Sequence, residues 1–267
     1  QKLRTTNPRI IRTLSLDYEE LKMKTIAYTD AQYPDATPVA WTRSRTVSLA
    51  AGVLYLLTFL AIPAAALYAP VRDPNYIAGP GPDTAVISGG ILEIIVALAC
   101  IGTAVALYPV VKRQSEAFAL GFVGARILEA GTIFAGVVAL MTMVTLRQTG
   151  AGAQALVTGR ALLATYDWFH LGQNLMPAVN AVLLGSLLYR ARLVPRILPL
   201  LGFIGAPLLV ANTVVLMFGV TGSLLTLTTI GVLPIAVWEF SLGVWLVVKG
   251  FNSSAITAEF DKMETGG

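Results

Sequence analysis

The stretch 117–146, AFALGFVGARILEAGTIFAGVVALMTMVTL, decides the fold class, and only Arg126 and Glu129 in it are charged. A helix needs about 20 mostly apolar residues to cross the hydrocarbon core of a membrane, and this stretch is longer than that. Ionisable side chains inside a membrane are costly unless they face the protein interior and find a partner. The stretch therefore predicts a membrane-spanning helix that carries a buried polar pair.

Five further stretches have the same apolar character. Over the whole chain of 267 residues, 55% are hydrophobic and 13% are charged, whereas an ordinary soluble domain carries roughly 25% charged residues. The single cysteine, Cys100, excludes a scaffold held together by disulfides. We predict an all-α polytopic membrane protein, a bundle of six transmembrane helices at 47–69, 86–108, 117–146, 166–189, 197–218 and 225–249.

The chain is expected to have three parts: a polar cytoplasmic arm (1–46), the six-helix domain (47–251) and a short cytoplasmic tail (252–267). The arm holds eight of the 19 Lys and Arg residues and five of the 15 acids, with one short helix expected near 15–25. No signal peptide is expected, because the first apolar stretch follows this polar arm. The loop 70–82, rich in Pro and Gly, should close one end of the bundle, and a short separate helix is expected at 154–164.

The positions of the basic residues predict the orientation. With an even number of spans, both ends of the chain lie on one side of the membrane. Eight basic residues beside the spans fall on that side: Arg43, Arg45, Lys112, Arg113, Arg190, Arg192, Arg196 and Lys249. Three fall on the other side: Arg72, Arg147 and Arg160. Cytoplasmic loops carry the excess of positive charge. We therefore expect a multi-pass protein of the cell membrane with both termini cytoplasmic. Aromatic residues predicted to lie at the opposite interface are Tyr68, Tyr76, Tyr166 and Trp168.

The charged and polar residues inside the spans are the candidate site. Arg126 and Glu129 are three residues apart, as are Asp167 and His170, so each pair shares a helix face, and Asn174 continues the second face. The candidate set for an internal polar cavity is Glu93, Arg126, Glu129, Asp167, His170, Asn174 and Glu239. Two interpretations remain open. These residues either tie helices together, with Arg126 neutralising Glu129 or Glu93, or line a cavity that binds or passes a small molecule, a lipid or a proton.

The surplus of acids favours the cavity. The three glutamates exceed the one arginine, so at least one of them must bind a proton, pair with His170 or face water. In the cavity hypothesis Arg126 holds an anionic group or a carboxylate, while Glu129 and Glu239 titrate.

An intramembrane enzyme is the first alternative. His170 is the only histidine, which excludes a bis-histidine haem and any multi-histidine metal site. In an enzyme His170 would act with a glutamate as acid and base, or the two would share a metal ion, and Asp167 would orient the imidazole. No catalytic residue, metal site or cofactor can be named from the sequence. Cys100 is expected to pack as a small apolar residue.

The second alternative is an accessory or structural subunit of a larger membrane complex. The partners expected are therefore the lipid bilayer, a small-molecule or lipid ligand, and partner membrane subunits. Nucleic acid is not expected, because the net charge of +4 mainly reflects membrane orientation.

Four stretches resemble one protein family. They are VSLAAGVLYLLTF at 47–59, GFVGARILE at 121–129, LVPRILP at 193–199 and PIAVWEFSLGVWLVVKGF at 234–251. Together they resemble the bacterial integral membrane proteins grouped as domain-of-unknown-function family 4386. The resemblance covers about 44–251, and the Arg-x-x-Glu and Trp-Glu elements are its most specific parts. It implies a fold but no activity.

Overall fold

The computed structural model describes residues 36–219 and 224–252 of the chain. The chain divides into two units, Gln1–Arg43 and Ser44–Gly267. Of the first unit only the helical residues 36–43 are described, so the helix predicted near 15–25 lies outside the described residues. The same holds for nearly all of the predicted tail.

The described residues form helices and no strand, and the bundle is all-α as predicted. The principal helices are α2 (Ala36–Leu57), α3 (Ala61–Leu67), α4 (Asp83–Val111), α5 (Glu116–Gln148), α6 (Leu156–Ala191), α7 (Ile197–Met217) and α8 (Leu224–Val248). Six segments are long and apolar enough to cross a membrane: Ser44–Leu67, Asp83–Val111, Glu116–Gln148, Gly152–Ala191, Ile197–Met217 and Gly231–Val248. The prediction of six spans is confirmed, while the orientation of the termini stays a prediction.

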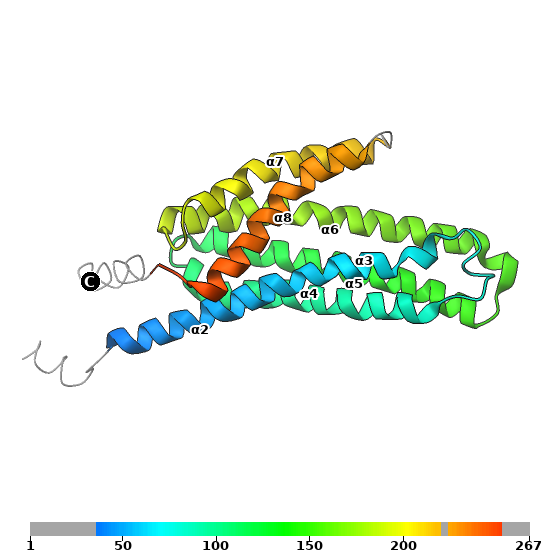
Figure 1. Ribbon diagram of the computed structural model, residues 1–267, viewed down its shortest axis with the longest axis horizontal. Coiled ribbons are helices and arrows are strands. Elements are labelled where there is room, and N and C mark those ends of the chain that lie inside the picture. The colour runs from blue at the N-terminus through cyan, green and yellow to red at the C-terminus, as the bar shows by residue number, and fades with distance from the viewer. Residues whose placement is uncertain (1–35, 220–223, 253–267) are drawn as a thin grey trace, which may run out of the picture. The chain divides into compact units, whose positions relative to one another are not determined.

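Successive helices pack side by side. In Figure 1, α4, α5 and α6 run alongside one another, and α7 and α8 form a hairpin beside α6. The helix α8 crosses α2, and the two backbones are so close that a Cβ atom on Gly52 would lie 2.7 Å from the carbonyl oxygen of Gly243. Arg45 donates to the carbonyl oxygens of Leu246 (3.2 Å) and Val247 (2.6 Å), which lack helical partners at the end of α8.

The buried core has three clusters. The largest lies between α2 and α4–α8 and includes Leu107, Phe122, Leu184 and Trp238. A second joins the loop after α3 to α4, α5 and α6, and a third joins the middle of α4 to the middle of α5. Large apolar side chains are also exposed along the outward faces of the helices, and hydrocarbon would cover them in a membrane.

The first span is interrupted, unlike the other predicted spans. A 3₁₀ turn at Thr58–Leu60 separates α2 from α3. Pro63 has no N–H to donate to the carbonyl of Phe59, so an α-helix cannot continue regularly through this point. The hydroxyl of Thr58 donates to the carbonyl of Tyr55 at 2.7 Å. Prolines inside α4, α6, α7 and α8 leave those helices continuous.

The fourth span begins earlier than predicted. The separate short helix expected at 154–164 is wrong, because α6 runs from Leu156 without a break. Residues 156–165, LVTGRALLAT, include good helix formers. This first part of α6 packs on the loop after α3, where Gly159 leaves no room for a Cβ atom beside the side chain of Ile77. The loop 70–82 packs on the helix ends, as expected, through buried Val71, Tyr76 and Ile77.

The three tyrosines predicted to lie at the interface are buried inside the protein, and their depth in the membrane stays a prediction. Tyr68, Tyr76 and Tyr166 are buried in the second core cluster, and of the four aromatic residues assigned to that boundary only Trp168 is exposed. Each of these tyrosine rings can bury its apolar face while the hydroxyl bonds inside the protein.

Candidate functional site

Arg126 is the centre of the most buried polar group in the described chain. Its side chain lies on α5 and is 1% exposed. One guanidinium nitrogen donates to Glu129 at 3.0 Å and lies 3.6 Å from the sulfur of Cys100 on α4, and the other nitrogen donates to Glu239 on α8 at 3.4 Å. The arginine therefore bonds to two carboxylates at once, one on its own helix and one on another.

Three more side chains complete the surroundings of Arg126. The guanidinium lies over the ring of Tyr55 at 4.8 Å from the ring centre and over that of Phe122 at 5.8 Å. The side-chain amide of Asn180 on α6 donates to Glu129 at 2.9 Å. Segments from α2, α4, α5, α6 and α8 thus meet at one charged centre, which the apolar core encloses.

A cavity of about 210 Å³ lies against this centre. It is lined by Glu129 and Glu239, and by polar residues of α6. The full lining is Thr58, Phe59, Ala61, Ile62, Val96, Glu129, Gln173, Asn174, Pro177, Leu209, Val232, Ile235, Ala236 and Glu239. Most of the wall is apolar, and the two carboxylates are its only charged groups. We call this space the acidic cavity.

The structure brings together four of the seven candidate residues. Glu129, Asn174 and Glu239 line the acidic cavity, and Arg126 bonds to both of its carboxylates. The i,i+3 spacing predicted the contact of Arg126 with Glu129. The bond to Glu239 takes the place of the proposed pairing with Glu93.

Glu93 belongs to a second polar group, nearer the loop after α3. The hydroxyl of Tyr68 donates to its carboxylate at 3.0 Å. The ring of Tyr68 meets that of Tyr166 edge to face, with centres 5.5 Å apart, and Tyr166 stacks on His170 at 5.7 Å. The Nδ1 atom of His170 is buried and has no hydrogen-bond partner among the described residues. Burial raises the pKa of Tyr68, which keeps its hydroxyl protonated as the donor to Glu93.

Asp167 pairs with an arginine of the loop. Its carboxylate accepts two bonds from Arg72, at 2.6 and 3.0 Å, and both side chains are about half exposed. This bond raises the pKa of Arg72. Asp167 was expected to hold the imidazole of His170, but no hydrogen bond between the two is found among the described residues. Asp167 bonds to Arg72 instead, whose fork-shaped guanidinium fits a carboxylate better.

The same end of the bundle has a second ion pair. Arg147 bonds to both carboxylate oxygens of Asp83 and donates to the carbonyl of Gly79 at 3.0 Å. The hydroxyl of Tyr76 donates to Asp83 at 2.9 Å. Burial, and then this hydrogen bond, raise the pKa of Tyr76 to about 12. This group joins the loop 70–82 to the ends of α4 and α5.

Sequence reasoning missed several residues of these groups. Asn180 is an amide inside a predicted span, and that signal alone could have marked it. Tyr55 is likewise a polar tip inside an apolar stretch. Cys100 was expected to pack as an apolar residue, but its sulfur lies within reach of the guanidinium of Arg126. Nothing in the sequence separates Tyr68 and Tyr166 from ordinary interfacial tyrosines.

The positions of the His, Cys, Asp and Glu side chains also show whether they could bind a metal ion together. In the part of the chain that the structure describes, no three His, Cys, Asp or Glu side chains lie close enough to hold a metal ion. His170 belongs to the Glu93 group, while Glu129 and Glu239 are held by Arg126. Glu129 and Glu239 make the acidic cavity rich in hydrogen-bond acceptors, and Arg126 is the one cation among the described residues that bonds to them.

Comparison with known proteins places the chain in a family. Residues 50–250 match the family described as Domain of unknown function (DUF4386). The chain belongs to the DUF4386 family. The match runs from within α2 to the end of α8, so it includes every residue of the acidic cavity. No curated protein and no solved structure matches the chain. The DUF4386 assignment therefore supports the membrane-type helical bundle, and the activity has to be argued from the site.

Proposed function

We propose that this chain is a membrane protein that binds a small amphipathic amine in the acidic cavity. The observation that carries the proposal is the charge balance at the cavity wall. Glu129 and Glu239 share one counter-charge, Arg126, so one negative charge is left over when both acids are ionised. A buried charge without a partner is costly, which favours the uptake of a proton or a cationic group.

The other polar groups of the cavity favour a ligand that donates hydrogen bonds. Pro177 has no N–H, so the carbonyl of Gln173, one turn earlier, lacks its regular helical donor, and both residues line the cavity. An ammonium group offers three donors and no acceptor. It would match the carboxylate of Glu239 and this carbonyl, whereas an anion would be repelled.

The way into the cavity favours an amphipathic molecule. Ile62 and Val232 line the cavity and are 68% and 37% exposed on the outside of the bundle. Glu129 and Asn174 lie well inside α5 and α6, so the opening is at the side of the bundle and away from its ends. A ligand with an apolar body could enter from the hydrocarbon. We also propose a cell-membrane location with both termini cytoplasmic, which the distribution of basic residues supports.

The test compares three molecules of matched length: octylamine, octanol and octanoate. Binding to the full chain in detergent micelles is measured by thermal stabilisation and by calorimetry. We expect octylamine to bind most tightly. The substitution Glu239→Gln should weaken it by about tenfold or more, as expected for the loss of one charged hydrogen bond.

Glu116→Gln is the matched control, because Glu116 is an acid on the same protein that lies outside the cavity. It should leave octylamine binding unchanged. Equal binding of octanol and octylamine would show an apolar cavity without charge selection and would contradict the proposal. An unchanged affinity in a folded Glu239→Gln protein would contradict it as well.

A further inference from the structure

The end of the bundle opposite the loop 70–82 carries an excess of positive charge. Among residues 44–219 and 231–252, seven basic side chains lie there against one acid, Glu116: Arg45, Lys112, Arg113, Arg190, Arg192, Arg196 and Lys249. At the other end, two of three arginines are bonded to aspartates. We call the first of these the basic end.

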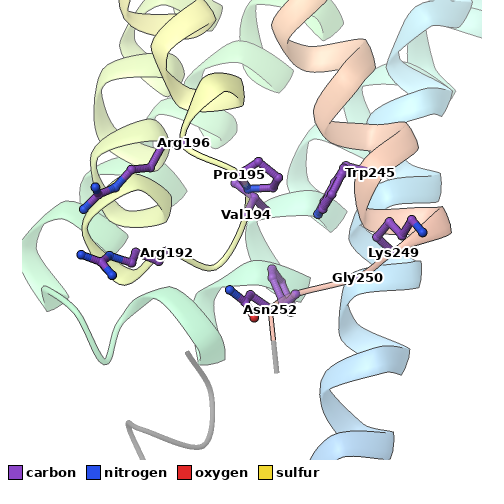
Figure 2. Close-up of a pocket in the computed structure, with 9 residues that line it drawn as sticks. Arg192, Val194, Pro195, Arg196, Trp245, Lys249, Gly250 and Asn252 are labelled. Carbon is purple, nitrogen blue, oxygen red and sulfur yellow. The ribbon is translucent and has the colours of Figure 1, made fainter. Parts of the chain in front are cut away.

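A hollow of about 560 Å³ lies at the basic end, between the turn that joins α6 to α7 and the end of α8. Figure 2 shows Arg192 and Arg196 extending on one side of it and Lys249 on the other, with Val194, Pro195 and Trp245 between them. The remaining lining residues are Gly250, Phe251 and Asn252. We call this hollow the basic pocket.

The chain conformation around the pocket is specific. Arg192 ends α6 in the left-handed region, with φ 53° and ψ 29°, which is uncommon for a residue other than glycine. The backbone N–H of Asn252 donates to the carbonyl of Leu193 at 2.8 Å, and this bond ties the segment after α8 to the α6–α7 turn. The two walls of the pocket are therefore held at a fixed separation.

The three cations are available to an anion. Arg192, Arg196 and Lys249 are exposed, and no described acidic residue forms an ion pair with any of them. The guanidinium of Arg196 lies over the ring of Tyr189, 4.9 Å from its centre, which orients it without neutralising it. Phosphate is one of the anions that arginine and lysine groups bind.

The apolar surroundings distinguish a lipid from a soluble phosphate. The pocket floor contains Val194, Pro195 and Phe251, and Trp245 lines its wall. Exposed apolar side chains of α7 and α8 continue from the pocket along the helices, including Ile197 and Val248. Tryptophan is enriched where head groups meet hydrocarbon, and basic pockets between transmembrane helices bind anionic head groups.

We propose that the basic pocket binds the phosphate-bearing head group of an anionic membrane lipid. The arginine and lysine side chains at the rim of the pocket hold the phosphate, and the acyl chains follow the apolar faces of α7 and α8. The site is separate from the acidic cavity and does not depend on the function proposed for that cavity, since the two share no lining residue.

The experiment measures lipid binding to the full chain by native mass spectrometry from detergent micelles. Phosphatidylglycerol is the anionic probe, phosphatidylcholine is the zwitterionic one, and glycerol phosphate is the soluble competitor. Wild-type protein should prefer phosphatidylglycerol by about tenfold or more, since each nearby cation adds to the attraction. The triple variant R192Q/R196Q/K249Q should lose this preference.

The matched control removes the same charge from the same end of the bundle outside the pocket: K112Q/R113Q/R190Q. It should keep the wild-type preference. Equal losses in both triple variants would show attraction to a basic surface without a site, and would overturn the proposal. So would wild-type protein that binds both lipids alike. Displacement of the lipid by an equal concentration of glycerol phosphate would identify a soluble phosphate ligand and overturn the lipid assignment.

Discussion

Replacing Arg126 tests whether the charged centre holds the bundle together. The substitution Arg126→Gln keeps a polar side chain but removes the positive charge that faces Glu129 at 3.0 Å and Glu239 at 3.4 Å. Both carboxylates are buried, so they cannot recover their bonds from water. Breaking a buried ion pair from one side costs about 3–5 kcal/mol, because an uncompensated charge stays behind. We expect a loss of that size in the free energy of unfolding.

The two carboxylates should respond differently to this loss. Glu129 keeps the bond from Asn180 at 2.9 Å, whereas Arg126 is the only described residue that donates to Glu239. Most of the penalty should therefore come from Glu239. Adding Glu239→Gln to Arg126→Gln removes the stranded charge, and the double variant should be more stable than Arg126→Gln alone by about 1.5–3 kcal/mol.

The assay is reversible unfolding by sodium dodecyl sulfate in mixed micelles, followed by tryptophan fluorescence and circular dichroism. Trp238 is fully buried in the largest core cluster and reports on its opening. Arg160→Gln is the control, because Arg160 is exposed and lies outside the charged centre. A loss below about 1 kcal/mol for Arg126→Gln, typical of a surface pair, would refute the reasoning. If adding Glu239→Gln to Arg126→Gln did not restore stability, the assignment of most of the lost free energy to Glu239 would be refuted.

Three other predictions use the same unfolding measurement. Gly52→Ala should cost about 1–3 kcal/mol, because its Cβ atom would lie 2.7 Å from the carbonyl oxygen of Gly243. Gly131→Ala is its control and should be neutral or stabilising, since a Cβ atom there meets nothing within 4 Å. Asp167→Asn should cost at most about 1 kcal/mol, because the ion pair is half exposed, and added salt should reduce the difference from wild type. Arg147→Gln should lower the free energy of unfolding more than Asp167→Asn does, because Arg147 also ties a loop carbonyl to α5.

The sequence predicts the number of spans well and the break in the first span poorly. Apolar length is a local property, so stretches of about 20 such residues can be read directly. Helix ends depend on the packing around them. Residues 156–165 lie outside the span predicted from the sequence, yet they continue α6 and pack on Ile77 of the loop. A proline predicts that a helix is weakened, but among the described spans only the one with Pro63 is interrupted near its proline.

The candidate site is predictable within one helix and unpredictable between helices. Helical spacing puts Arg126 and Glu129 on one face, and they do form an ion pair. Spacing does not say which helix that face meets, so the sequence suggested Glu93 as the alternative partner and did not single out Glu239. The path of α8 across α2 brings Glu239 to the arginine, while Glu93 lies by Tyr68.

The two proposed sites select opposite charges, and this makes them independent tests of the structure. The acidic cavity has two carboxylates for one arginine. The basic pocket has three cations without an acidic partner among the described residues, and it lies where the helices end. A ligand that fits one is repelled by the other. The variant R192Q/R196Q/K249Q should therefore leave octylamine binding intact, and Glu239→Gln should leave the preference for phosphatidylglycerol intact. If either variant changed both kinds of binding, the two regions would be coupled through the α7–α8 hairpin, which contributes residues to both.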